Sequence, residues 1–179
     1  PGDTTWAEFT DIAPLMDNPV VDPDALMTII YTSGSTGQPK GVMHSFATIN
    51  WAASACLGQL QCTSADRVMS YLPLAHITER VIIELASFYS GMQVTFVESL
   101  DTFTHDVQSA QPTLFVSVPR LWTKFQMGVL AKMPQKKLNI LLKIPFVNTL
   151  IKKKLADGLG LDQARVLGCG SAPVSPALL

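Results

Sequence analysis

Residues Tyr31 to Val42 read Y-T-S-G-S-T-G-Q-P-K-G-V. Four serine and threonine side chains and three glycines fall within this stretch, together with a Pro-Lys pair. Glycine permits the backbone angles that turn successive N–H groups toward one point, and such a nest binds anions. A lysine charge beside the nest favours a polyphosphate. The stretch therefore predicts a phosphate-binding loop, to which we assign Thr32, Ser33, Gly34, Ser35, Thr36, Gly37 and Lys40.

The loop follows the apolar, partly β-branched run Leu26 to Tyr31, which has the length and composition of a buried strand. It does not match two common nucleotide motifs: Lys40 lies between Pro39 and Gly41 rather than in a Gly-Lys-Ser/Thr sequence, and G-x-G-x-x-G is absent. A plain Ser/Gly-rich turn between a strand and a helix is the alternative. The density of hydroxyls, glycines and charge favours phosphate binding over that alternative.

Apolar runs of strand length alternate with helical patterns along the rest of the chain. We expect strands at 68–72, 93–97, 113–118 and 165–170. We expect helices at 46–60 (capped by Ser45), 77–89 (ended by Gly91), 105–110 and 120–132, and in a basic stretch at 135–155 that Pro145 interrupts. This alternation predicts an α/β fold with a mostly parallel sheet covered by helices, and ligands at the carboxyl ends of the strands.

The composition suits one folded unit with a sizeable core, because 47% of the 179 residues are hydrophobic and 15% are charged. No apolar run approaches the roughly 18 residues of a membrane-spanning helix, and the first residues lack signal-peptide character, so a cytoplasmic location is expected. Cys56, Cys62 and Cys169 have no C-x-x-C spacing, and no Cys/His group has zinc-ligand spacing. The sequence therefore predicts neither a disulfide framework nor a metal site made by protein alone.

Charge is distributed unevenly along the chain. Residues 1–106 carry twelve acidic against three basic residues, whereas residues 107–156 carry nine basic residues and no acidic one. Nucleic acid is not expected as the partner of this basic segment, because it lacks interleaved aromatic residues and a recognisable nucleic-acid module. An anionic membrane or an acyl-CoA suits it better. Within it, residues 136–154 mix lysines with apolar residues. Pro145 breaks the helical face of this stretch, so the preferred interpretation is a solvated helical insertion packed on the core. Peripheral contact with the inner face of a membrane is the alternative.

Three segments together resemble the adenylate-forming enzymes, the superfamily of acyl-CoA synthetases, beetle luciferases and peptide-synthetase adenylation domains. The stretch at 31–42 is similar to their phosphate-loop signature, Tyr71 to Arg80 (Y-L-P-L-A-H-I-T-E-R) to their second core motif, and Gly168 to Pro173 (G-C-G-S-A-P) to their adenine-contacting strand end. Phe115 to Trp122 (F-V-S-V-P-R-L-W) is similar to the long-chain fatty acyl-CoA synthetase branch. The resemblance covers nearly all of the chain.

The resemblance implies a ligase that uses ATP, Mg²⁺ and CoA. A carboxylic acid, here a long-chain fatty acid, would attack the α-phosphorus of ATP, and CoA would then displace the acyl-adenylate. His76 would position the carboxylate and acyl group, Lys40 would neutralise phosphate charge, and the adenine side would be formed by Gly170, Ser171, Ala172 and Pro173. From the residues alone, a structural role for His76 and a simple turn at 170–173 stay open.

Three features of the resembled family would lie beyond Leu179: the Y-G-x-T-E segment, the acidic ribose motif, and the small C-terminal domain with its catalytic lysine. We therefore expect residues 1–179 to be part of one large N-terminal AMP-binding domain and to be inactive alone. A non-catalytic nucleotide-binding or scaffolding module on the same core is the alternative. An ATPase or kinase with an unusual phosphate loop is a third possibility.

Overall fold

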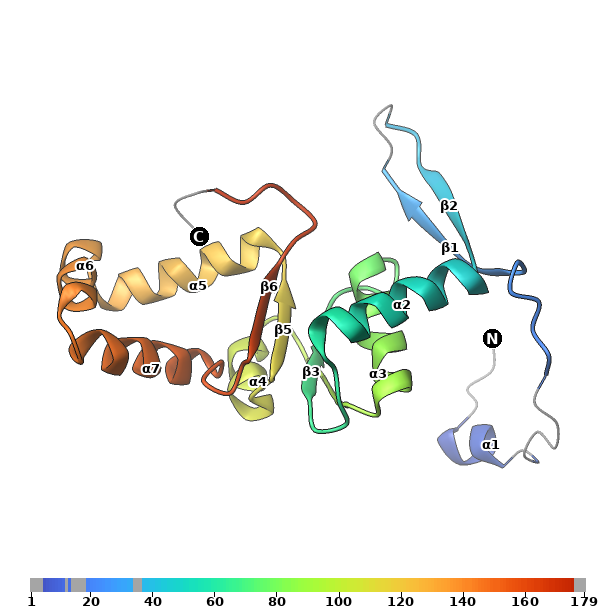
Figure 1. Ribbon diagram of the computed structural model, residues 1–179, viewed down its shortest axis with the longest axis horizontal. Coiled ribbons are helices and arrows are strands. Elements are labelled where there is room, and N and C mark those ends of the chain that lie inside the picture. The colour runs from blue at the N-terminus through green and yellow to red at the C-terminus, as the bar shows by residue number, and fades with distance from the viewer. Residues whose placement is uncertain (1–4, 12, 14–18, 34–36, 176–179) are drawn as a thin grey trace.

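The computed structural model describes residues 5–11, 13, 19–33 and 37–175 (Figure 1). A short helix, α1 (Trp6–Thr10), precedes a hairpin of two strands, β1 (Leu26–Thr32) and β2 (Lys40–Ser45). The body of the molecule then follows as α2 (Phe46–Leu60), β3 (Arg67–Ser70), the π-helical η1 (Glu79–Leu85), α3 (Ala86–Ser90), β4 (Gln93–Phe96), α4 (Phe103–Ala110), β5 (Leu114–Ser117), α5 (Pro119–Lys132), α6 (Gln135–Lys143), α7 (Val147–Leu159) and β6 (Val166–Cys169).

The strands of the body are parallel, which confirms the predicted α/β fold. β3 pairs with β4, and β5 pairs with β6. β3 and β5 meet at their amino ends, where the Thr113 amide donates a hydrogen bond of 2.9 Å to the Arg67 carbonyl. The chain thus passes from β3 to β4 on one side and returns to β5 on the other. Ligands of open α/β sheets bind at the carboxyl ends of the strands beside such a reversal.

Alternation of side chains along the strands divides the core into two layers. Met69 and Phe115 point to one face, where they pack with buried residues of α4 and α5. Val68 and Leu114 point to the other face and pack with residues of η1 and α3. A third cluster joins η1 to α2. Because η1 packs between α2 and the sheet, it is buried on two sides.

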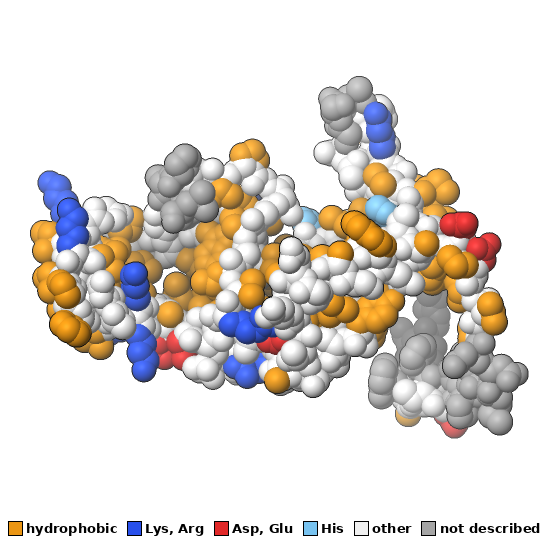
Figure 2. Space-filling model, in the orientation of Figure 1, with side chains coloured by type: hydrophobic (Ala, Val, Ile, Leu, Met, Phe, Trp, Pro, Cys, Tyr) orange, Lys and Arg blue, Asp and Glu red, His pale blue; other side chains and the backbone are white. Residues whose placement is uncertain are grey.

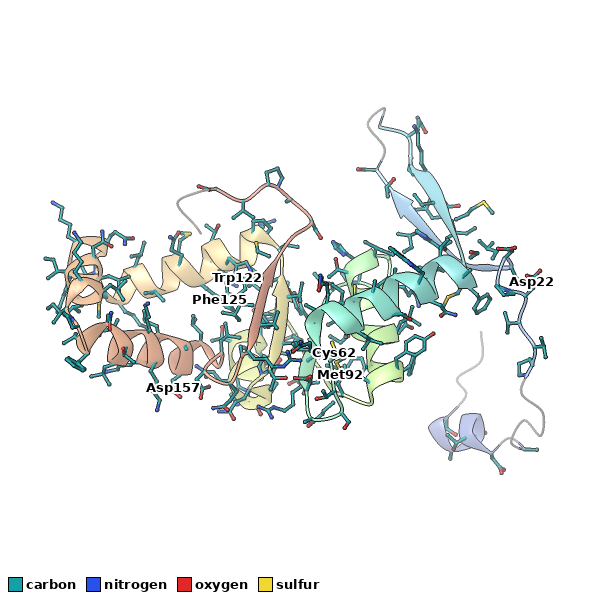
Figure 3. The ribbon with its side chains drawn as sticks, in the orientation of Figure 1. Asp22, Cys62, Met92, Trp122, Phe125 and Asp157 are labelled. Atoms are coloured by element: carbon teal, nitrogen blue, oxygen red, sulfur yellow. The ribbon has the colours of Figure 1, made fainter. Side chains whose placement is uncertain are left out.

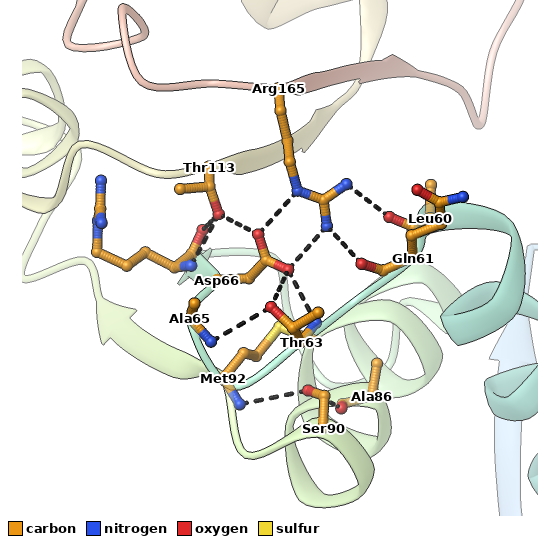
Figure 4. A network of polar contacts seen from close by, with 11 residues as sticks. Leu60, Gln61, Thr63, Ala65, Asp66, Ala86, Ser90, Met92, Thr113 and Arg165 are labelled. Carbon is orange, nitrogen blue, oxygen red and sulfur yellow. Dashed lines mark hydrogen bonds and ion pairs between the residues drawn. The ribbon is translucent and has the colours of Figure 1, made fainter.

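Polar side chains at the amino ends of β3, β5 and β6 tie these strands together (Figure 4). We call Asp66, Thr113 and Arg165 the amino-end clamp. The Asp66 carboxylate accepts hydrogen bonds from Thr113 Oγ1 (2.7 Å), Arg165 Nε (2.9 Å) and Arg165 Nη2 (2.7 Å). Arg165 also donates to the carbonyls of Leu60 and Gln61. Leu60 is the last residue of α2, and Gln61 follows it. The Arg165 guanidinium holds the pKa of the Asp66 carboxyl well below its ordinary value.

The sequence prediction was wrong about the surroundings of the phosphate-binding stretch. Residues 40–45 form a strand that pairs antiparallel with β1, so the stretch connects two strands of a hairpin rather than a strand and a helix. β1 is also mostly exposed, and Ile30 is its one buried residue. The hairpin stands away from the parallel strands, and its base lies against α2 (Figure 1). The apolar side chains of β1 suit burial, but beyond the base of the hairpin no described residues form a second layer over them.

Candidate functional site

The loops after β3, β5 and β6 meet at the carboxyl edge of the parallel strands. The segment Tyr71 to Arg80 follows β3, and residues 170–173 follow β6. The hydroxyls of Thr78 and Ser171 lie 3.4 Å apart and form a hydrogen bond between these two segments. The structure therefore brings together two of the three segments that the sequence singled out.

A cavity of about 290 Å³ opens at this edge, and we call it the strand-end cavity. Most of its lining is apolar, but three hydroxyl-bearing residues, Thr78, Ser117 and Ser171, also line it. The remaining lining residues are Leu60, Leu72, Ile82, Val116, Val118, Val166, Gly168, Cys169 and Gly170. A mostly apolar wall with a few convergent polar groups is typical of a small-molecule site.

His76 lies in the loop between β3 and η1 and is half-buried. Its backbone amide donates to the Pro73 carbonyl at 2.7 Å, which closes a tight turn. Its Nδ1 accepts a hydrogen bond of 3.3 Å from the Thr78 amide. A neutral imidazole that accepts at Nδ1 carries its proton on Nε2. His76 can therefore donate from Nε2 to a carboxylate or phosphate oxygen.

Two polar side chains, one buried and one half-buried, hold this loop against the sheet. Glu79 is fully buried, and its carboxylate accepts a hydrogen bond of 3.3 Å from the Leu72 amide. Burial raises the pKa of Glu79. The Tyr71 hydroxyl donates to the Val116 carbonyl at 3.0 Å, and burial raises its pKa as well. These contacts fix the start of the loop that carries His76 relative to β5.

A second cavity, of about 460 Å³, lies between α5, α6, α7 and β6, and we call it the helical cavity. It shares Gly168 and Cys169 with the strand-end cavity. Trp122 anchors its wall, because the indole Nε1 donates to the Gly168 carbonyl at 3.2 Å and the ring meets Phe115 edge-on, with ring centroids 5.5 Å apart. Trp122 and Phe125 both come from α5 (Figure 3). Other lining side chains are almost all apolar and include Phe125, Val129, Leu130, Leu138, Leu155, Leu159, Leu167 and Val174.

The predicted phosphate-binding residues lie at the far end of the hairpin. Thr32 ends β1 directly opposite Lys40, which begins β2, and Ser33 and Lys40 are both exposed. Gly37 has a φ of +78°, a backbone conformation that favours glycine. Gly34, Ser35 and Thr36 lie outside the described residues.

No hydrogen bond between described residues joins the hairpin to the loop of His76. The hairpin rises from the amino end of α2 toward the same side of the molecule as the carboxyl ends of β5 and β6 (Figure 1). Of the residues assigned to adenine, Gly170 and Ser171 line the strand-end cavity, whereas Ala172 and Pro173 follow it on the surface. Among the described residues, therefore, no hydrogen bond links the predicted phosphate residues to the other two segments, and the assignment of all these residues to ATP stays a prediction.

Among the described residues, no group of three or more His, Cys, Asp or Glu side chains is placed to hold a metal ion. Likewise, within the described part of the chain no helix is long and apolar enough to cross a bilayer.

Sequence reasoning gave no role to Thr78, Ser117 or Trp122, although all three line the cavities. One available signal was Pro119, because proline favours the first turn of a helix and here begins α5 directly after β5. A strand-to-helix junction at a carboxyl edge is where binding residues gather. The helical cavity itself could not be inferred, because it depends on how far α7 stands from α5.

Comparison with known proteins gives consistent results. A long-chain-fatty-acid–CoA ligase of Xenopus laevis is 32% identical over 212 residues, which cover 96% of this chain and 28% of the ligase. Fatty acyl-CoA synthetase B of Dictyostelium discoideum is 33% identical over 175 residues, covering 86% of this chain and 26% of that protein. The chain thus spans little more than a quarter of the length of these relatives.

Solved structures agree at the level of the fold. The A-PCP didomain of carboxylic acid reductase from Segniliparus rugosus, in complex with AMP, matches with a TM-score of 0.71 and 27% identity, over 96% of this chain and 24% of that chain. The inhibitor-bound N-terminal domain of FACL13 from Mycobacterium tuberculosis matches with a TM-score of 0.61 and 22% identity, over 96% of this chain and 37% of that chain.

The family model that matches describes AMP-binding enzymes, and its match runs from residue 3 to residue 179. All three motif segments of the sequence and both cavities of the structure fall inside it. This chain therefore belongs to the AMP-binding enzyme family.

Proposed function

We propose that this chain is part of a carboxylic-acid:CoA ligase that activates a long-chain fatty acid with ATP. The observation that carries the proposal is the pair of adjoining cavities at the carboxyl edge. The strand-end cavity offers hydroxyl groups beside the His76 loop, and the helical cavity beside it is apolar. A fatty acid joins a polar carboxylate to a long alkyl chain, so its binding site needs polar groups for the carboxylate and an adjoining apolar cavity for the chain. The matched relatives include long-chain-fatty-acid–CoA ligases.

In the proposed first step, a carboxylate oxygen bonds to the α-phosphorus of ATP and the bond to pyrophosphate breaks. No side-chain nucleophile is required, so catalysis depends on positioning and on neutralising oxygen charge. His76 Nε2 would donate to the carboxylate or to the acyl-phosphate, and the Lys40 ammonium would neutralise the departing phosphates. In the second step the thiolate of CoA attacks the acyl carbon, and AMP leaves.

Magnesium is expected to arrive with the nucleotide. The phosphate-binding stretch supplies hydroxyl and ammonium groups rather than carboxylates. Mg²⁺ commonly keeps several waters and binds through substrate phosphates with few protein ligands, so this stretch suits it. When bound, the ion would lower the charge on the phosphate oxygens.

The helical cavity is proposed to hold the alkyl chain. Each buried methylene stabilises the complex by about 0.8 kcal/mol, so a long apolar cavity favours long acids over short ones. Trp122 would line the path of the chain beside Gly168, where the two cavities adjoin.

Pyrophosphate release from the full-length protein, measured with a panel of acids of increasing length, tests this function. We expect release to require an acid and KM to fall as the acid lengthens. Trp122→Leu should flatten that dependence on length, whereas Trp51→Leu, which changes an exposed tryptophan of α2, should not. ATP turnover without any acid would instead indicate an ATPase or kinase.

Lys40→Ala tests the phosphate role. It should weaken ATP binding by about tenfold or more, and Lys124→Ala, another exposed lysine, is the matched control. Equal ATP affinity in the two variants would refute the assignment of Lys40.

A non-catalytic nucleotide-binding or scaffolding module is the second candidate. The hydrogen bonds of His76 among the described residues lie within its own loop and η1 and none reaches the hairpin, which favours this candidate, because catalysis needs phosphates and carboxylate at one place. Such a module would bind ATP but release no pyrophosphate with any acid.

The ligase proposal also assigns residues 1–179 to one N-terminal AMP-binding domain that acts in the cytoplasm and is inactive alone. Robust acid-dependent pyrophosphate exchange by the 179-residue chain would overturn the proposal that the chain is inactive alone.

A further inference from the structure

The end of the molecule formed by α6 and α7 exposes large apolar side chains. Ile140 on α6, Phe146 at the corner between the helices, and Leu150 on α7 are all exposed, Phe146 to 91%. Exposed lysines surround them on the same two helices: Lys136, Lys137, Lys143, Lys152, Lys153 and Lys154. We call this set the lysine–apolar face. Figure 2 shows hydrophobic and basic side chains side by side at this end.

The backbone at the corner keeps Phe146 exposed. Phe146 has a φ of +65°, in the left-handed region that aromatic residues rarely adopt. It follows Pro145, which ends the helical run of α6. Burial of a phenyl ring is a strong stabilising force, yet this ring gains almost none within the described residues. An exposed ring on an unfavourable backbone indicates an apolar environment that lies outside the chain.

From α6 to Ala156 of α7, the helices of this face carry charges of one sign. Residues 107–156 contain nine basic residues and no acidic one, so the lysines of α6 and α7 have no acidic neighbour along their own helices before Asp157. On α6, Lys136, Ile140 and Lys143 are spaced by four and three residues, which places them on one side of a helix. On α7, Leu150 and Lys154 have the same relation.

Apolar side chains flanked by lysines suit the surface of a lipid bilayer, where charged headgroups lie over apolar acyl chains. The apolar groups enter the boundary between headgroups and acyl chains, while the ammonium groups stay with anionic headgroups. Lysines spread over two helices fit an extended surface better than one small anion. Nucleic acid fits less well, because Phe146 is the one aromatic side chain of this face, and isoleucine and leucine offer no stacking platform for successive bases.

We propose that the lysine–apolar face docks on an anionic lipid surface, with Phe146, Ile140 and Leu150 entering the bilayer boundary. This docking does not depend on the proposed ligase activity, because it needs neither ATP nor an acid.

Co-sedimentation of the full-length protein with vesicles tests the proposal. One set of vesicles contains phosphatidylcholine alone, and the other adds phosphatidylserine. We expect at least tenfold tighter binding to the anionic vesicles in about 0.1 M salt, and loss of most of that preference in about 1 M salt, where charges are screened within about 3 Å.

Two variants of the face separate its charges from its apolar groups. Lys136→Gln, Lys137→Gln and Lys143→Gln together should weaken binding to anionic vesicles by roughly 100-fold, at about fivefold for each lysine. Phe146→Asn, which keeps a residue tolerant of the left-handed backbone, should weaken it by about tenfold. Phe88→Asn is the matched control, because Phe88 on α3 is 78% exposed and lies outside the face.

Equal binding to both kinds of vesicle, or binding to neither, would overturn the proposal. So would an equal loss of binding in the Phe88 and Phe146 variants. Binding to duplex RNA in the absence of binding to anionic vesicles would assign the face to nucleic acid instead. A dimer in light scattering that Phe146→Asn converts to a monomer, again without vesicle binding, would assign it to a second copy of this chain.

Discussion

Arg165 should stabilise the fold more than any other exposed or half-exposed charge that we have described. Its guanidinium donates four hydrogen bonds of 2.7–2.9 Å, two to Asp66 and one each to the carbonyls of Leu60 and Gln61. The Asp66 side chain is only 5% exposed, so replacing Arg165 by methionine leaves a buried carboxylate without its partner. Breaking a buried ion pair costs about 3–5 kcal/mol. The Arg165 side chain is 39% exposed, and solvent screening reduces this cost to about 2–3 kcal/mol.

The cost should depend on pH in a defined direction. The Arg165 guanidinium lowers the pKa of Asp66 from its ordinary 3.8, so the folded state prefers the ionised carboxyl. That preference stabilises the fold above pH 3.8 and is lost as the pH falls through the folded pKa. The difference in unfolding free energy between wild type and Arg165→Met should therefore be full at neutral pH and shrink in acid.

Urea unfolding followed by far-UV circular dichroism measures this difference. Arg120→Met is the matched control, because Arg120 is exposed and its loss should change stability by less than about 0.5 kcal/mol. Combining Arg165→Met with Asp66→Asn should recover part of the loss, since no buried charge is then left unpaired. A cost below about 1 kcal/mol at neutral pH, or one that does not change in acid, would refute the reasoning.

Three further substitutions test other parts of the fold. Gly160→Ala should lower the free energy of unfolding, measured by thermal unfolding, by about 3 kcal/mol or more, because Gly160 has a φ of +72° and a Cβ there would lie 2.5 Å from Gln108 Cα. Gly158→Ala is the control: a Cβ there would meet no atom within 4 Å, so it should stabilise α7 slightly. Ser45→Ala should cost about 1 kcal/mol, because Ser45 Oγ accepts the Thr48 amide at the start of α2, and Ser54→Ala in the same helix is its control. Burial raises the pKa of Glu79 above its ordinary 4.5, so its contribution to stability is full below pH 4.5 and is lost as pH rises through the folded pKa. Glu79→Gln should therefore gain stability relative to wild type as pH rises in urea titrations, and a constant difference would contradict this.

Local signals in the sequence predicted most elements of the body. Ser45 caps α2 as expected, and Gly91 ends α3 in the left-handed conformation that glycine favours. The strands begin and end within two residues of the predicted bounds. These features depend on neighbouring residues, so their causes are present in short windows of sequence.

Features that join distant segments could not be predicted. Asp66 and Arg165 are 99 residues apart, and nothing near either residue indicates that they meet. The pairing of β1 with β2 was missed because Gly41 and His44 do not read as strand residues, although they lie opposite Tyr31 and Thr28 in the hairpin. The Thr78–Ser171 contact of the site also depends on the order of the strands. The sequence thus singled out two segments that meet at the carboxyl edge but not the contact between them, and the roles assigned to individual residues stay predictions.

The amino-end clamp and the candidate site lie at opposite ends of the same strands. β3, β5 and β6 have four residues each, so about 13 Å of strand separates the two ends. Loss of Arg165 should therefore lower the fraction of folded molecules without moving the Nε2 of His76 or the hydroxyl of Ser171 in those that stay folded. We expect the full-length Arg165→Met protein, assayed well below its unfolding temperature, to keep the KM of wild type for acid and ATP while its unfolding temperature falls. A large change in KM would mean that the clamp also sets the geometry of the carboxyl edge, because the strands would then have shifted relative to one another.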